Sequence, residues 1–83
     1  DGEYRQLLES AALCIARGDA RGLTRAAYKL GWHAGNLSAP IALEAALRLE
    51  SMGRANDLLG APEALHNLER ALEQLRNETS AIY

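Results

Sequence analysis

The 83-residue sequence contains no phenylalanine and no valine, and it has only two prolines and one cysteine. The shortage of β-branched and aromatic residues argues against a sheet, because strands draw on these residue types. The lone Cys14 excludes an internal disulfide and is typical of a reducing compartment, so we expect a cytoplasmic protein. No apolar run reaches the ~18 residues that a membrane span requires, so we expect no membrane partner.

Neither sign of charge dominates the chain. Nine basic and eleven acidic residues give a net charge of −2, and the two signs are interspersed along the sequence. A nucleic-acid-binding domain usually carries a basic stripe, which this pattern does not provide, so we expect no nucleic-acid partner. The length is that of a single domain, which we assign to residues 1–83.

Alanine and leucine dominate what is present, and both favour helix. Apolar spacing predicts four helices over residues 3–17, 20–36, 40–58 and 62–81. Gly18 ends the first helix, and Asp19 and Ser38 are placed to cap the second and third. Pro40 and Pro62 each fall in a first turn, where the missing N–H does no harm. Because short linkers between long helices make neighbours antiparallel, we predict an all-α, up-down-up-down four-helix bundle.

The helical spacing also predicts which side chains face the core. The residues expected to point inward are Leu7, Leu8, Ala11, Cys14 and Ile15 on the first helix, Leu23, Ala26, Ala27, Leu30, Ala34 and Leu37 on the second, Ala42, Ala45, Ala46, Leu49 and Met52 on the third, and Leu65, Leu68, Leu72 and Leu75 on the fourth. With this register Leu43 and Leu47 point outward. A rotated third helix is the alternative, and it would bury both leucines.

Residues 26–39 read A-A-Y-K-L-G-W-H-A-G-N-L-S-A. This stretch resembles the signature of bacterial histidine-phosphotransfer (HPt) domains, roughly A-H-x-L-K-G-S-A-x-N-L-G-A. The matching positions are Ala27, Leu30, Ala34, Asn36, Leu37 and Ala39. The resemblance implies a four-helix bundle whose second helix carries an exposed histidine. In that family the histidine takes a phosphoryl group from a receiver domain.

The departures from the HPt pattern fall at its functional positions. Tyr28 stands in place of the phospho-accepting histidine, and a phenol is mostly protonated at neutral pH and a poor nucleophile. Gly31 replaces the lysine that steadies the phosphate. Trp32 replaces the glycine that gives the receiver room, and His33 replaces a small residue. We therefore predict that the chain is not an enzyme and has no catalytic residues.

Tyr28 and Trp32 are i, i+4 neighbours, so their rings lie along one face of the second helix. A helical wheel places this face away from the residues that point toward the core, and Arg25 lies on the same face as the rings. Tyr, Trp and Arg are enriched at binding hot spots, so we predict a surface on the second and third helices that binds a folded protein. The residues predicted to form it are Tyr28, Trp32, His33, Gly31, Arg25, Ile41, Leu43 and Leu47.

Two origins fit this pattern. Exchanges confined to a few positions, toward large aromatic residues, are typical of an engineered binder on an HPt-like scaffold. A natural pseudo-HPt domain of two-component signalling is the alternative, with His33 as a much less favoured phosphoacceptor. The surface could also pair with its own copy in a homodimer, which we rank lower. Nothing predicts a cofactor, and His66 has no second ligand at metal-binding spacing.

Overall fold

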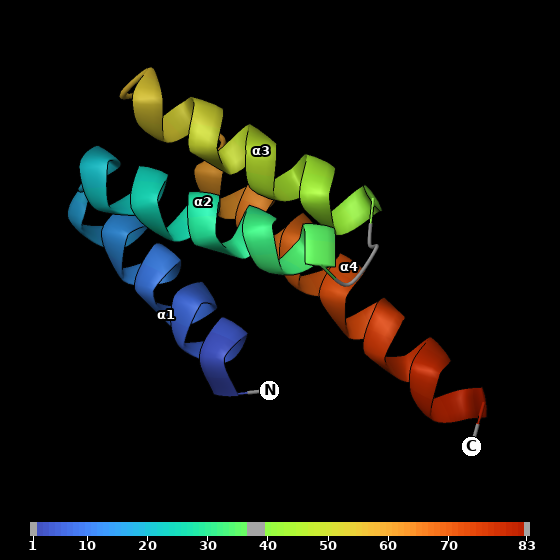
Figure 1. Cartoon of the computed structure of the whole chain (residues 1–83). Helices are drawn as coiled ribbons and strands as arrows, with labels where there is room; N and C mark the ends of the chain where they lie inside the picture. The colour runs from blue at the N-terminus through green and yellow to red at the C-terminus, as the bar shows by residue number, and fades with distance from the viewer. Residues whose placement is uncertain (1, 37–39, 83) are drawn as a thin grey trace.

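A computed structural model describes residues 2–36 and 40–82, with side chains for residues 4–36 and 40–74. Its helices are α1 (Gly2–Arg17), α2 (Ala20–Asn36), α3 (Pro40–Arg54) and α4 (Ala61–Ile82). The helices run alternately up and down in chain order, and the described residues include no strand (Figure 1). The predicted all-α four-helix bundle is confirmed. None of the described helices is both long and apolar enough to cross a membrane.

The turn between α1 and α2 takes only two residues. Gly18 adopts a φ of 71°, which is the left-handed conformation that ends many helices. Its N–H donates to the Ile15 carbonyl, and the Asp19 N–H donates to the Cys14 carbonyl, which together form a Schellman motif. The Asp19 carboxylate then accepts a 3.0 Å hydrogen bond from the Gly22 N–H and caps α2. The predicted boundary between these helices is confirmed.

The third helix is shorter than the sequence predicts. It ends at Arg54 rather than near residue 58, because Asn56 adopts a φ of 56°. The Asn56 N–H donates to the Gly53 carbonyl and the Asp57 N–H to the Met52 carbonyl, so a second Schellman motif ends α3. Asparagine tolerates this conformation better than most residues, which makes it a natural stop signal. The predicted continuation to residue 58 is therefore wrong.

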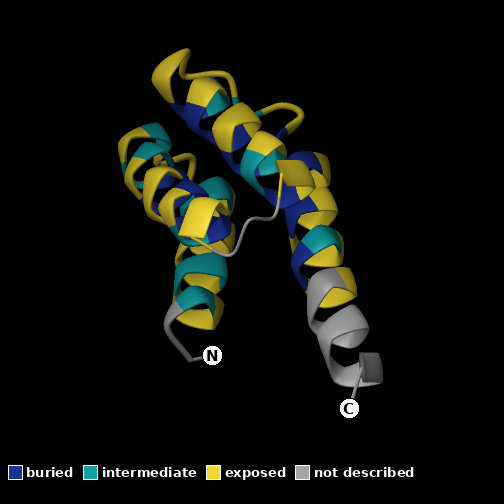
Figure 2. Ribbon diagram, turned by 45° about the vertical axis from the view of Figure 1, so that its right-hand side comes forward, coloured by how far each residue is buried: buried dark blue, intermediate teal, exposed yellow. Residues whose placement is uncertain are grey.

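The core is built from small and medium-sized side chains. Among the described side chains, the buried apolar residues are eight alanines and six leucines. The largest that are fully enclosed are Leu23, Leu30, Leu49 and Leu68. These residues line the inner sides of the helices, while exposed residues cover the outer sides (Figure 2). All described side chains that were predicted to face inward lie in this core or pack against it. Leu37, Ser38 and Leu75 were also assigned roles, and their side chains lie outside the described part.

Among the described residues, α2 and α3 make the most extensive contact between helices, and α1 packs less closely on α4 than on α2. Gly53 of α3 is buried against the first turns of α2. A Cβ atom at Gly53 would lie 2.9 Å from both the Ala20 carbonyl oxygen and the Thr24 amide nitrogen. Glycine therefore lets the two backbones approach at this point. This contact was not predicted from the sequence.

Candidate functional site

The two aromatic rings of α2 lie on its outer side. Tyr28 is 61% exposed and Trp32 is 63% exposed, although both are large and mostly apolar. The opposite side of the same helix carries the fully buried Leu30 and Ala34, so the helix already has a filled inner face. The exposure predicted for both rings from the helical wheel is therefore confirmed.

His33 is half-buried, and on a helical wheel it lies between the outer and the core-facing sides of α2. Its imidazole meets the Trp32 indole in a T-shaped arrangement, with ring centroids 5.6 Å apart and planes 82° from parallel. Edge-to-face packing of this kind stabilises aromatic pairs and limits the rotamers available to both rings. The half-buried imidazole therefore contacts the exposed indole directly.

The contact between α2 and α3 fixes which residues of α3 lie beside the rings. Gly31 packs near Ala46 at one level, and Gly53 packs near Thr24 at the other. In an antiparallel pair these two contacts place Leu47 at the level of Leu30, between the levels of Tyr28 and Trp32. Leu47 is 53% exposed, as predicted.

Together the outer sides of the two helices form one surface. We call Tyr28, Trp32, Leu47 and Arg25 the aromatic face. All four side chains are exposed, and three of them are apolar or largely apolar. Exposed apolar groups gathered on one side of a small domain mark an interaction site more often than isolated ones do.

Two residues predicted for this surface lie beneath it instead. Gly31 is buried, and a Cβ atom there would lie 3.6 Å from the Ala46 Cβ and 3.7 Å from the Leu43 Cδ1. It faces α3 and leaves no room for a partner's backbone, so its assignment to the binding surface is wrong. Leu43 is half-buried and packs against the core rather than pointing outward. A helical wheel counts only the residues that face the centre of the bundle as buried. The contact between α2 and α3 also covers residues beside them, which explains both errors.

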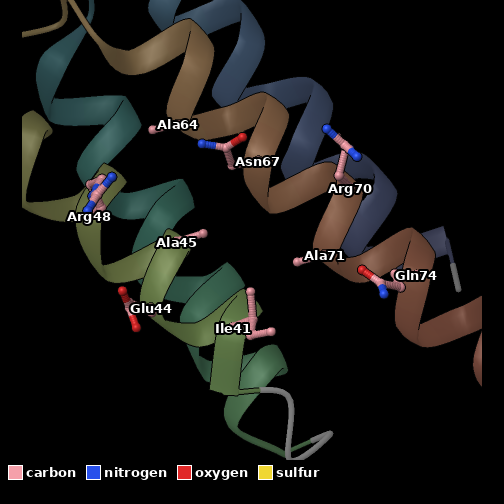
Figure 3. Close-up of a pocket in the computed structure, with 9 residues that line it drawn as sticks. All are labelled: Ile41, Glu44, Ala45, Arg48, Ala64, Asn67, Arg70, Ala71 and Gln74. Carbon is pink, nitrogen blue, oxygen red and sulfur yellow. The ribbon is translucent and has the colours of Figure 1, made fainter.

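Ile41 also lies elsewhere, and its assignment to the surface of α2 and α3 is corrected. It is 74% exposed but lines a groove between α3 and α4. Figure 3 shows Ile41 and Ala45 on the α3 side of this groove and Ala71 and Gln74 on the α4 side. The α3 positions that face α4 lie on the opposite flank from Leu47, so Ile41 does not extend the aromatic face.

Arg25 occupies the end of the aromatic face near the start of α2. Together with Arg21 and Arg54 it lines a shallow hollow between the N-terminal turns of α2 and the C-terminal turn of α3. Arg54 donates a 2.6 Å hydrogen bond to Glu50, which is 9% exposed. Among the described side chains, Arg54 is the arginine of this hollow that pairs with a carboxylate of α3.

The remaining chemistry-bearing residues form no site among the described side chains. No group of three His, Cys, Asp or Glu residues is arranged there to hold a metal ion. Cys14 faces inward, as predicted, and packs against the core, although it is only half-buried. Burial, and then the nearby Asp19 carboxylate, raises the pKa of the Cys14 thiol, so it stays protonated and poorly nucleophilic.

The groove between α3 and α4 was not predicted. Its floor includes Ala45, Ala64 and Ala71, and its rims carry Arg48 and Arg70. Small residues on both helices were a usable signal, because alanine leaves space between helices that larger residues fill. The periodicity of each helix alone does not report that space, which depends on the pairing of α3 with α4.

Comparison with known proteins yields no relative. No family model matches the chain, no curated protein matches it, and no solved structure matches it.

Proposed function

We propose that this chain is a non-catalytic protein-binding module that uses its aromatic face to dock on a folded protein. The observation that carries the proposal is the 63% exposure of Trp32, the only tryptophan in the chain. A tryptophan in water loses the stabilisation that burial of its ring provides. A partner that covers it recovers that stabilisation as binding free energy.

The composition of the face supports this function. Tyr, Trp and Arg are the residue types most enriched among side chains that dominate binding energy. Tyr28 and Trp32 lie one helical turn apart and Leu47 lies beside them on α3, so one partner surface can cover all three. The core has no need of these rings, because Leu30 and other inward residues already fill the inner face of α2.

Each residue has a distinct expected role. Trp32 is the anchor that fills an apolar pocket on the partner, and His33 steadies it through the edge-to-face contact. Tyr28 adds apolar area and a hydroxyl that exchanges a hydrogen bond with the partner. Leu47 extends the apolar area onto α3, and Arg25 contributes a charged contact at the rim.

The proposal includes the HPt-like scaffold and an engineered origin for its binding surface. Four antiparallel helices with Tyr28 at the position of the phospho-accepting histidine support a scaffold of that kind. The half-buried imidazole of His33, packed against Trp32, supports a positioning role better than phosphoryl transfer. The aromatic exchanges on an exposed face favour a surface selected for binding.

The test compares three baits in a capture experiment with cell extract and mass spectrometry. The baits are the wild-type chain, Trp32→Ala, and Leu59→Ala as the matched control. Leu59 is 93% exposed and apolar, but it lies in the turn between α3 and α4 and is not part of the aromatic face. A partner should be retained by the wild type and by Leu59→Ala and lost with Trp32→Ala.

Titration of the captured partner then gives the magnitude. Truncation of an anchor tryptophan costs about 2 kcal/mol or more, which is roughly a 30-fold rise in Kd. A Kd that is unchanged in Trp32→Ala would refute the proposed function. A loss of binding in Leu59→Ala of the same size would show that exposed apolar area in general is responsible, and this would refute it as well.

A further inference from the structure

The helix that carries the aromatic face has a charge unlike the rest of the chain. Between Ala20 and Asn36 it has three basic residues, Arg21, Arg25 and Lys29, and no acidic residue. All three are exposed, and they follow one another at i, i+4 spacing along the outer side of the helix. The rest of the chain has six basic and eleven acidic residues, so positive charge is concentrated on α2.

The carboxylates of neighbouring elements do not offset this charge. On α3, Glu50 is 9% exposed and is paired with Arg54, and Glu44 lines the groove toward α4. On α1, Glu9 lines the groove shared with α4, together with Glu69 and Glu73. Where side chains of α1 and α3 are described, the exposed carboxylates, Glu9 and Glu44, therefore lie in the grooves that border α4.

The Asp19 carboxylate precedes α2 and is held at its N-terminus. It accepts the hydrogen bond from the Gly22 N–H, and its second oxygen lies 4.0 Å from the Cys14 sulfur. This arrangement commits it to capping the helix. It offsets part of the positive charge near Arg21. The charges of Arg25 and Lys29, which lie one and two turns farther along α2 near the rings, are not offset by it.

We infer that the partner surface recognised by the aromatic face is acidic, with carboxylates arranged around an apolar site. This inference rests on the proposed function and names the chemistry of its partner. Arginine and lysine beside exposed rings favour carboxylates at the rim of the complex, and opposite charges speed association and exclude wrong partners. A second copy of the chain docking through the same face would bring six cations together, which disfavours self-pairing.

Two synthetic helical peptides serve as probes. Both carry the same stripe of leucines, which is flanked by glutamates in one peptide and by lysines in the other. Each is labelled with a dye, and its binding to the full chain is followed by fluorescence anisotropy. We expect the acidic peptide to bind at least about tenfold more tightly at ~0.1 M salt. The difference should shrink at ~1 M salt, where the Debye length falls from about 10 Å to about 3 Å.

Matched charge reversals locate the effect. Arg21→Glu, Arg25→Glu and Lys29→Glu together should reverse the preference between the two peptides. The control combines Arg5→Glu, Arg48→Glu and Arg70→Glu, which change the net charge equally but line the grooves beside α4. The control should keep the preference for the acidic peptide. Circular dichroism checks that both variants remain helical.

The outcomes separate this inference from the proposed function. Equal binding of the two peptides, no binding of the acidic one, or the same loss in both triple variants would overturn the inference. Trp32→Ala should weaken both peptides, and binding unchanged by it would refute the proposed function instead. A chain that sediments as a dimer, and as a monomer in Trp32→Ala, would assign the face to a second copy and overturn the acidic partner.

Discussion

The substitution Gly53→Ala is expected to destabilise the bundle, although alanine is the better helix former. Gly53 is buried where α3 crosses the start of α2. The added Cβ would overlap the Thr24 hydroxyl and would lie 2.9 Å from the Ala20 carbonyl oxygen and the Thr24 amide nitrogen. The hydroxyl can rotate only by giving up its 2.8 Å hydrogen bond to the Ala20 carbonyl. The backbone atoms cannot rotate away, so the helices must separate.

Two opposing contributions set the size of the effect. Replacing glycine by alanine inside a helix gains about 1 kcal/mol from helix propensity. Forcing an extra carbon into a packed contact costs about 1–3 kcal/mol, and a contact with backbone belongs at the upper end of that range. The net loss in the free energy of unfolding should therefore be about 1–2 kcal/mol. For a domain of this size the loss lowers the Tm by roughly 5–15 °C.

Thermal and urea unfolding followed by circular dichroism measure this change. The matched control is Gly35→Ala in α2, because a Cβ there meets no atom within 4 Å. The control should gain about 0.5–1 kcal/mol. Gly31→Ala should also be stabilising, because its Cβ would sit at ordinary contact distance from α3. A Gly53→Ala chain as stable as the Gly35→Ala chain would refute the close contact between α2 and α3.

Three further predictions concern the core, the cap and the thiol. Leu68→Ala empties a fully buried position and should cost about 2–5 kcal/mol in urea unfolding; a cost below about 1 kcal/mol would contradict its burial. Asp19→Ala removes the acceptor of the Gly22 N–H and should cost about 1 kcal/mol, whereas Asp19→Asn keeps an acceptor and should cost less by thermal unfolding. Burial and Asp19 raise the pKa of the Cys14 thiol, so iodoacetamide near pH 8 should alkylate Cys14 more slowly than it alkylates free cysteine. Alkylation of Cys14 should be faster in Asp19→Asn than in the wild type, because the substitution removes the nearby negative charge. Alkylation as fast as that of free cysteine would contradict the raised pKa. Because folding raises the pKa of this thiol, its contribution to the free energy of unfolding is present at lower pH and is lost as the pH rises through the folded-state pKa.

The sequence predicted the parts of the fold that local interactions determine. Gly18 and Asp19 end one helix and begin the next through hydrogen bonds within a few residues, and both roles were evident from residue type. The end of α3 was missed because asparagine is compatible with both a helical and a left-handed conformation. Asn56 adopts the left-handed one, and its residue type alone does not decide between them.

Contacts between helices were harder to predict. Gly53 is the position where α3 meets Thr24 of α2, and nothing in the spacing of its own helix indicates this contact. Gly31 and Leu43 were placed at the surface because a helical wheel assigns one inner stripe to each helix. Each helix of this bundle packs against two neighbours, so residues beside the stripe are covered as well. Periodicity within one helix does not indicate where its neighbours lie.

The candidate site was predicted best where it depends on one helix. The inner face of α2 is fully accounted for by residues such as Leu30, so the exposure of Tyr28 and Trp32 followed from the wheel. The contribution of α3 depends on how that helix is rotated against α2 and α4. This rotation separates Leu47, which is exposed at the level of the rings, from Ile41, which lies in the groove with α4. Binding by this surface remains a prediction.

The most direct measurement is the intrinsic fluorescence of Trp32 in the isolated chain, with acrylamide as the quencher. Trp32 is the only tryptophan, so the signal reports on the aromatic face alone. We expect red-shifted emission and efficient quenching that stay constant on dilution, because 63% of the side chain is exposed. Blue-shifted emission that is protected from acrylamide at every dilution would show the indole buried within the monomer, and it would contradict a binding surface built on Trp32.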